Sequence, residues 1–187
     1  MQFFQKSLLA GAAFWLIFGA SGAFGIEESY GIGQDSKIAF HAKKFGFVSV
    51  DGEFKKFSGD LRLDENVIVA LSGVVELESV FSDSKGRDEH LLKEDFFDTA
   101  NFKQAHLKML SYEEKEQKDG KILGVMKVLL DLHGVQKELE LTTELQNGKE
   151  LELTLRGELN IKDFGIEGSA MNSNSVKLEF HTIWGAI

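Results

Sequence analysis

The sequence predicts an all-β fold: an eight-stranded antiparallel barrel with one short α-helix between the third and fourth strands. Two observations and one physical argument lead to this expectation. Most of the chain beyond residue 36 alternates apolar and polar side chains with a period of two, the pattern of strands with one buried face. Turn signals such as Asn147-Gly148 and Asp119-Gly120 separate the alternating segments. Closing eight such strands into a barrel would also leave no exposed sheet edge.

The alternation identifies the individual strands. It is clearest on either side of Asn147-Gly148, where leucines face one way and charged or polar residues face the other. After Asp119-Gly120, the apolar residues from Ile122 to Leu132 share one face in the same manner. The predicted strands are 37–45, 54–63, 67–77, 103–113, 122–132, 139–145, 151–156 and 175–184.

Residues 87–97 break the alternation. Leu92 and Phe96 are four residues apart and Leu91 lies beside them, which is the spacing of a short amphipathic helix. This helix would follow the third predicted strand and could lie over one end of the barrel.

Residues 1–23 differ in composition from the remainder of the chain. A single cation, Lys6, precedes the uncharged stretch 8–18 and a run of small residues at 19–23, a pattern typical of a secretory signal peptide. We expect cleavage between residues 22 and 25 and a single domain over 24–187, located in the periplasm. An uncleaved anchor stays open, because residues 7–26 carry no charge.

Composition excludes several classes of function. The chain has 30 Asp and Glu against 21 Lys and Arg and no basic run at either end, so we expect no nucleic-acid partner. It contains no cysteine, which excludes disulfides, thiolate metal sites and a cysteine nucleophile. The five histidines lack the spacing of metal ligands, and no nucleophile elbow or phosphate-binding glycine loop is present. We therefore expect no metal, no cofactor, no catalytic residues and no enzymatic activity.

The inward face of the predicted barrel indicates an apolar ligand. A barrel of eight strands is either filled by its own side chains or holds one small ligand, and periodicity alone does not separate the two cases. The inward residues are mostly Leu, Val, Ile, Met and Phe, which favours a dry, elongated lumen suited to a long hydrocarbon chain. The residues predicted to line this tunnel are Phe40, Phe54, Phe57, Met126, Val128, Leu130, Leu141, Leu153, Leu178 and Phe180.

Five polar residues are candidates for contact with the ligand's head group: His41, Arg87, Asp88, His90 and Asp163. Each also has a structural interpretation. The alternation would turn His41 outward, and Asp163 precedes a glycine in an expected turn. Asp88 could serve as a helix N-cap or first-turn carboxylate with Arg87 as its ion-pair partner.

Four stretches of the sequence resemble the YceI-like family of bacterial lipid-binding proteins. They are Phe40–Asp64, beginning Phe-His-Ala-Lys-Lys-Phe-Gly-Phe, then Gly86–Asp98, Leu132–Lys137 and Asn160–Ile166. The resemblance implies a lipocalin-like barrel with a helix at one end, enclosing an apolar tunnel for a polyisoprenoid or a similar long-chain amphiphile. It also implies a periplasmic or secreted protein. The sequence departs from the family pattern at three positions, which have Lys103, Leu107 and Glu138 where Pro, Phe and Pro are common.

These observations predict a periplasmic protein that carries or stores a long-chain lipid, such as a polyisoprenoid, a fatty acid or a fatty amide. Membrane contact would be transient and serve lipid exchange. Two alternatives stay open: an enzyme acting on a lipid held in the tunnel, and a structural or stress-related protein with a filled barrel. Pairing of two barrels into a homodimer is also left open.

Overall fold

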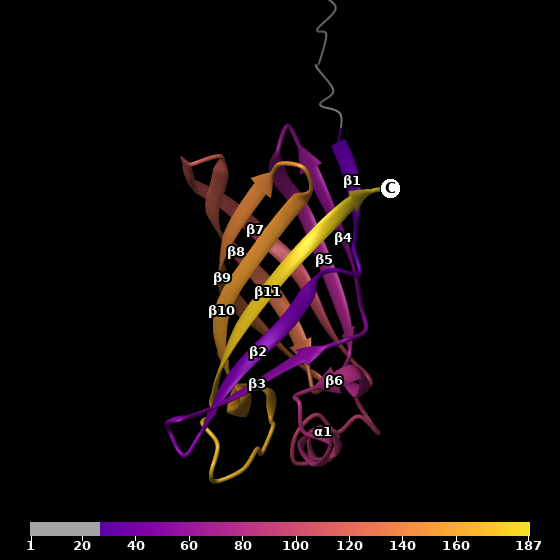
Figure 1. Cartoon of the computed structure of the whole chain (residues 1–187), viewed down its shortest axis with the longest axis vertical. Coiled ribbons are helices and arrows are strands. Elements are labelled where there is room, and N and C mark those ends of the chain that lie inside the picture. The colour runs from indigo at the N-terminus through magenta and orange to yellow at the C-terminus, as the bar shows by residue number, and fades with distance from the viewer. Residues whose placement is uncertain (1–26) are drawn as a thin grey trace, which may run out of the picture.

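The computed structural model of the protein describes residues 27–187 (Figure 1). The predicted signal peptide and its cleavage site lie outside these residues. The described chain forms a β-barrel with a short helix, α1 (Lys85–Leu91), at one end. None of the helices within this part of the chain is long and apolar enough to cross a membrane.

The wall of the barrel consists of eight antiparallel strands. In spatial order they are β1 (Glu27–Ile32), β4 (Phe57–Asp64), β5 (Val67–Glu76), β7 (Gln104–Lys118), β8 (Lys121–Leu132), β9 (Val135–Asn147), β10 (Leu151–Asn160) and β11 (Ser175–Ala186). β1 closes the ring, because it pairs with β4 on one side and with β11 on the other. The predicted fold class, a lipocalin-like eight-stranded antiparallel barrel, is confirmed.

The chain leaves the wall twice near its N-terminal end, after β1 and before β4, and this opens the wall at one end. β2 (Lys37–Lys44) follows β1 and pairs with β11 and with β3 (Val48–Phe54), which precedes β4. The outer edge of β3 pairs with the short β6 (Val80–Phe81) instead of with β5. The sequence pattern missed β1 and most of β3, because alternation is weak where the strands are short and broken.

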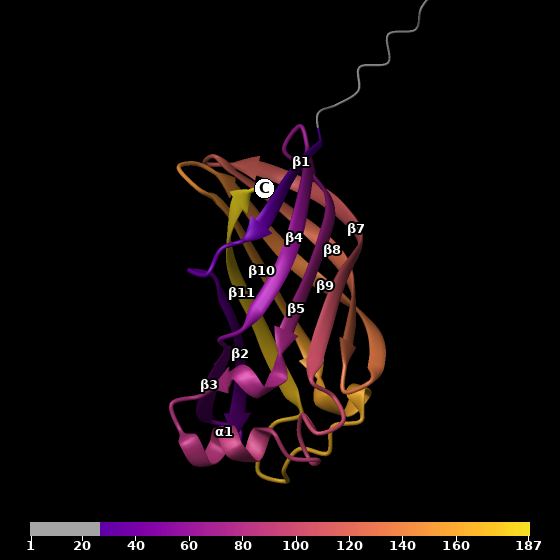
Figure 2. The same ribbon diagram turned by 90° about the vertical axis from the view of Figure 1, so that its right-hand side faces the viewer.

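The helix lies between β5 and β7, as predicted, but it is shorter and begins earlier than the predicted range 87–97. It ends at Leu91, whose carbonyl oxygen accepts a hydrogen bond from the N–H of Phe97 at 3.0 Å, so the chain turns back on itself. Figure 2 shows α1 across the end of the barrel where β2 and β3 lie. Two short 3₁₀ helices, η1 (Leu77–Ser79) and η2 (Ile161–Phe164), complete the connections at this end.

The interior is divided into two halves along the barrel axis. One half is filled by a compact cluster that includes the fully buried Leu61, Met126, Leu141 and Leu153. The second cluster lies toward α1 and includes Leu77, Phe96, Phe164 and Leu178. The period-two expectation for β8 is confirmed, because its residues 124, 126, 128, 130 and 132 are all buried.

Candidate functional site

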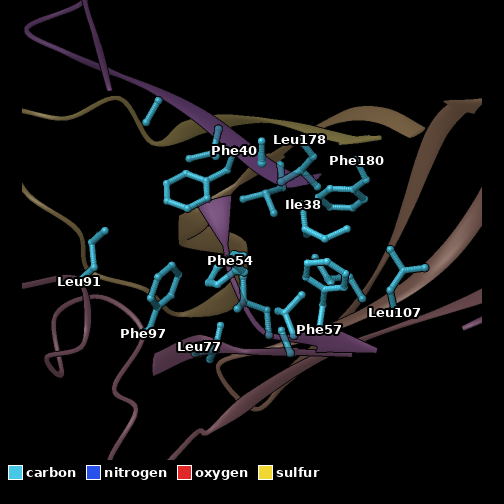
Figure 3. A pocket seen from close by; sticks show the side chains of 18 of the residues that line it. Ile38, Phe40, Phe54, Phe57, Leu77, Leu91, Phe97, Leu107, Leu178 and Phe180 are labelled. Carbon is cyan, nitrogen blue, oxygen red and sulfur yellow. The ribbon is translucent and has the colours of Figure 1, made fainter. Parts of the chain in front are cut away.

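The barrel contains a cavity of about 460 Å³ in the half that α1 covers (Figure 3). This volume falls within the range of about 300–1,000 Å³ typical of sites for small molecules. Its walls include residues of every described strand except β6 and β9, and the segment after α1 covers it from the side. The lining is predominantly aliphatic and aromatic, so the cavity is suited to an apolar ligand.

Three phenylalanine rings form one wall of the cavity (Figure 3). The ring centroids of Phe40 and Phe54 are 5.7 Å apart, and that of Phe97 lies 6.5 Å from the first and 5.7 Å from the second. Gly52 on β3 makes room for this arrangement, because a side chain there would overlap the ring of Phe40. The same contacts hold the segment after α1 against the barrel wall through Phe97.

Six of the ten residues predicted to line the tunnel line this cavity: Phe40, Phe54, Phe57, Leu130, Leu178 and Phe180. They come from five strands, β2, β3, β4, β8 and β11. The fold therefore brings the predicted aromatic and aliphatic residues together in one place, although their contact with a ligand stays a prediction.

The structure places the other four, Met126, Val128, Leu141 and Leu153, outside the cavity lining. They point inward as predicted but lie in the filled half, where they are fully buried in the compact cluster. The alternation fixes the face on which a strand residue lies, but not its height along the barrel axis. This is the physical reason for the correction.

The closed end of the cavity is formed by Trp184 and Thr182 on β11. The indole Nε1 of Trp184 donates a hydrogen bond to the hydroxyl of Thr182 at 2.8 Å, and this hydroxyl donates to the carbonyl oxygen of Leu153 at 2.6 Å. All these polar atoms are satisfied within the protein, so the floor offers an apolar ligand no unmet donor or acceptor. Both residues share the inward parity of Leu178 and Phe180, a signal by which the sequence could have identified them.

The mouth of the cavity is marked by lining residues that also reach solvent, among them Lys44, Arg87, His90 and Met171. Within residues 27–187, the lining contains a lysine, an arginine and two histidines, but no aspartate or glutamate. The chain as a whole carries a formal net charge of −9. The cavity is therefore free of carboxylates in a protein that is otherwise acidic, which favours a ligand with an anionic or hydrogen-bond-accepting end.

Arg87 lies at the mouth, whereas Asp88 is turned away from it. Arg87 Nε donates to the hydroxyl of Ser82 at 2.8 Å, and its Nη2 donates to the Ser82 carbonyl oxygen. The same hydroxyl donates to Asp88, which does not line the cavity. Asp88 thus anchors the start of α1 through Ser82. His90 lines the mouth, and its Nε2 lies 2.8 Å from Asp95 Oδ2.

The remaining head-group candidates, His41 and Asp163, lie away from the cavity lining. His41 Nδ1 lies 2.7 Å from Asp51 Oδ1 on the neighbouring strand, and its Nε2 lies 3.6 Å from Glu179. These contacts place it on the outer face of β2, as the alternation would indicate. Asp163 is exposed in η2, where the adjacent Phe164 is the buried residue.

A closed antiparallel barrel with an apolar cavity at one end belongs to the class of barrels that can hold one small ligand. Sequence comparison gives the family. A family model described as the YceI-like domain matches residues 32–183, and the chain therefore belongs to the YceI-like family.

Curated relatives support this assignment. Protein YceI from Escherichia coli O157:H7 is 30% identical over 175 residues, which cover 87% of this chain and 88% of the relative. A UPF0312 protein from Vibrio vulnificus is 35% identical over 114 residues, and this match covers 60% of the chain and 58% of that relative. The latter match thus spans a little more than half of the Vibrio protein.

Solved structures show the same fold. A polyisoprenoid binding domain from Saccharophagus degradans is similar with a TM-score of 0.68 and 17% identity, covering 86% of this chain and 99% of that one. BcnA from Burkholderia cenocepacia has a TM-score of 0.67 and 18% identity over 79% of this chain and 95% of its own. The Campylobacter jejuni YCEI protein has a TM-score of 0.62 at 24% identity, covering 74% of this chain and 85% of that one.

Proposed function

We propose that the protein binds a long-chain amphiphilic lipid, such as a polyisoprenoid, a fatty acid or a fatty amide, and carries or stores it in the periplasm. The observation that carries this proposal is the apolar cavity, which is closed at Trp184 and open beside α1. The similarity to a solved polyisoprenoid binding domain supports the class of ligand. The signal-like pattern of residues 1–23 supports the location.

The energy of binding would come mainly from burial of the hydrocarbon chain. Each CH₂ group moved from water into an apolar site contributes about 0.8 kcal/mol, without a requirement for direction. The floor at Trp184 and Thr182 limits how far the chain can enter, so the cavity would select ligands by length more than by chemical detail. This favours a carrier whose specificity resides at the mouth.

The polar end of the lipid would lie at the mouth, near Arg87, His90 and Lys44. These residues line the open end of the cavity, whereas His41, Asp88 and Asp163 do not. A hydrogen bond to a charged group contributes about 1.5–3 kcal/mol, whereas a neutral one contributes about 0.5–1.5 kcal/mol. An anionic or strongly accepting head group would therefore bind best.

Binding without chemical conversion fits the lining better than catalysis does. No carboxylate lines the cavity in the described part of the chain, so a general base there would have to be His90 or His106. Within the same residues, no group of three His, Asp or Glu side chains is arranged to hold a metal ion. The cavity itself argues against the filled-barrel alternative.

The direct test is mass spectrometry of organic extracts from the protein purified from its host. We expect about one lipid per chain. An extract free of lipid would refute the proposal, and a mixture of a lipid and its reaction product would favour an enzyme.

A second experiment tests the head group with two probes of equal chain length, oleate and oleamide. The Arg87→Gln substitution should weaken oleate binding about tenfold while changing oleamide binding little. Lys118→Gln, a change at the opposite end of the barrel, serves as the control. Equal losses for both probes would show that Arg87 acts only by holding Ser82.

A further inference from the structure

An apolar tip projects from the barrel beside the mouth of the cavity. It consists of the β2–β3 turn and the loop before β11. The exposed fractions of Phe45, Phe47, Val48 and Met171 are 54%, 78%, 44% and 50%. The N–H of Phe45 donates to the carbonyl oxygen of Met171 at 2.7 Å, so the two segments form one surface although they are far apart in sequence. We call this surface the 45/171 tip.

The turn at the 45/171 tip carries aromatic residues where turn geometry does not favour them. Phe45 and Gly46 have φ values of 54° and 78°, both in the left-handed region. Hairpin turns of this kind favour Asn or Asp followed by Gly, and a bulky residue with positive φ is uncommon. Phe45 and Phe47 are thus explained neither by packing in the core nor by the backbone of the turn.

The charge of the 45/171 tip is opposite to that of the chain. Residues 42–50 contain Lys43 and Lys44 and no carboxylate, and residues 168–176 contain no charged residue at all. The Lys44 ammonium lies 5.3 Å from the centre of the Phe45 ring. Apolar rings beside two cations complement the surface of a bilayer that contains anionic lipid.

The 45/171 tip is also continuous with the cavity. Lys44, Met171 and Asn172 belong to the tip region and also line the cavity. The exposed rings therefore lie next to the open end of the cavity. A lipid leaving a bilayer at the tip would enter the cavity without crossing bulk water.

We propose that the 45/171 tip docks on the surface of a bilayer containing anionic phospholipid. Phe45, Phe47 and Met171 would enter the boundary between head groups and acyl chains, and Lys43 would face the phosphates. This inference rests on the proposed lipid-carrier function and adds the surface by which the lipid is taken up and released.

The test measures association with vesicles of phosphatidylethanolamine and phosphatidylglycerol in a 3:1 ratio, with pure phosphatidylcholine vesicles for comparison. The protein is produced with its own leader and purified from the periplasm. We expect Phe47→Ser to weaken binding to the anionic vesicles at least about tenfold, because transfer of a Phe side chain from water into the bilayer contributes more than the 1.4 kcal/mol to which a factor of ten corresponds. Leu110→Ser on β7, at a position with 47% exposure, is the matched control and should have no effect.

A charge reversal tests the electrostatic attraction between the tip and anionic lipid. Lys43→Glu should weaken binding to the anionic vesicles at least about fivefold, and this loss should shrink as salt is added. Lys118→Glu, at the opposite end of the barrel, is the matched control. Equal binding of wild type to both vesicle compositions would overturn the electrostatic part of the proposal.

Two further outcomes would overturn the docking surface. Equal vesicle binding by Phe47→Ser and Leu110→Ser would show that the tip does not enter the bilayer. A wild-type dimer that Phe47→Ser converts to a monomer would assign the tip to a second copy of the chain. Retained lipid is measured in the same samples, because loss of vesicle binding with lipid still bound refutes docking alone, whereas wild type without any lipid refutes the carrier function.

Discussion

Two substitutions, Leu141→Phe and Leu130→Trp, distinguish the filled half of the barrel from the hollow half. Both leucines point inward, and the sequence pattern treats them alike. Leu141 is fully buried, and its Cδ2 atom occupies the space beside Gly157. Leu130 lines the cavity of about 460 Å³. An enlarged side chain has free volume only at the second position.

The expected magnitudes follow from this difference. Overpacking a filled core costs about 1–3 kcal/mol. In a domain of this size, each kcal/mol lowers the thermal midpoint by about 2–4 °C, so Leu141→Phe should lower it by several degrees. Leu130→Trp should leave the lipid-free protein nearly as stable as wild type, because the ring can occupy the cavity.

The two variants should also differ in how much stability a ligand adds. A ligand present at 100 times its dissociation constant stabilises the protein it binds by about 2.7 kcal/mol. Wild type and Leu141→Phe should both gain stability when oleate is added after complete delipidation, whereas Leu130→Trp should gain little and retain shorter chains. Thermal midpoints with and without oleate, together with mass spectrometry of retained lipid, provide the measurements. Equal destabilisation of both lipid-free variants, or undiminished lipid in Leu130→Trp, would refute the division into two halves.

Three other predictions test the register, the aromatic wall and the N-terminus. Met126→Asp should strongly lower the midpoint of urea denaturation, because it places an unpaired charge in the filled half. Glu140→Gln on the outer face is the control and should not lower it. Similar losses for both variants would contradict the assigned faces. Gly52→Ala should reduce the lipid retained after purification, because its Cβ would displace the Phe40 ring, whereas Gly185→Ala meets no atom within 4 Å and should retain the wild-type amount. The intact mass of periplasmic protein should correspond to an N-terminus between residues 23 and 26; full-length protein in the membrane fraction would instead support an uncleaved anchor.

The sequence by itself determined the fold class and the inward faces of the strands. In β8, the period of two correctly placed Met126, Val128 and Leu130 on the buried face. The Asp119-Gly120 signal marks a real turn in which both residues have positive φ, 52° and 77°. These features are local, because each depends on residues within one strand or one hairpin.

Only the tertiary structure decided which inward residues surround the cavity. Met126 and Leu130 lie on the same face of the same strand, yet one is packed in the filled half and the other borders empty space. The boundary between the filled half and the cavity depends on the long-range pairing of β2 and β3. It also depends on the packing of Phe97, from the segment after α1, against Phe40 on β2. Likewise, the N–H of Phe45 bonds to Met171 from a loop more than a hundred residues away. Height along a barrel and contacts between distant loops are set by the pairing of all the strands together, and local periodicity contains no information about either.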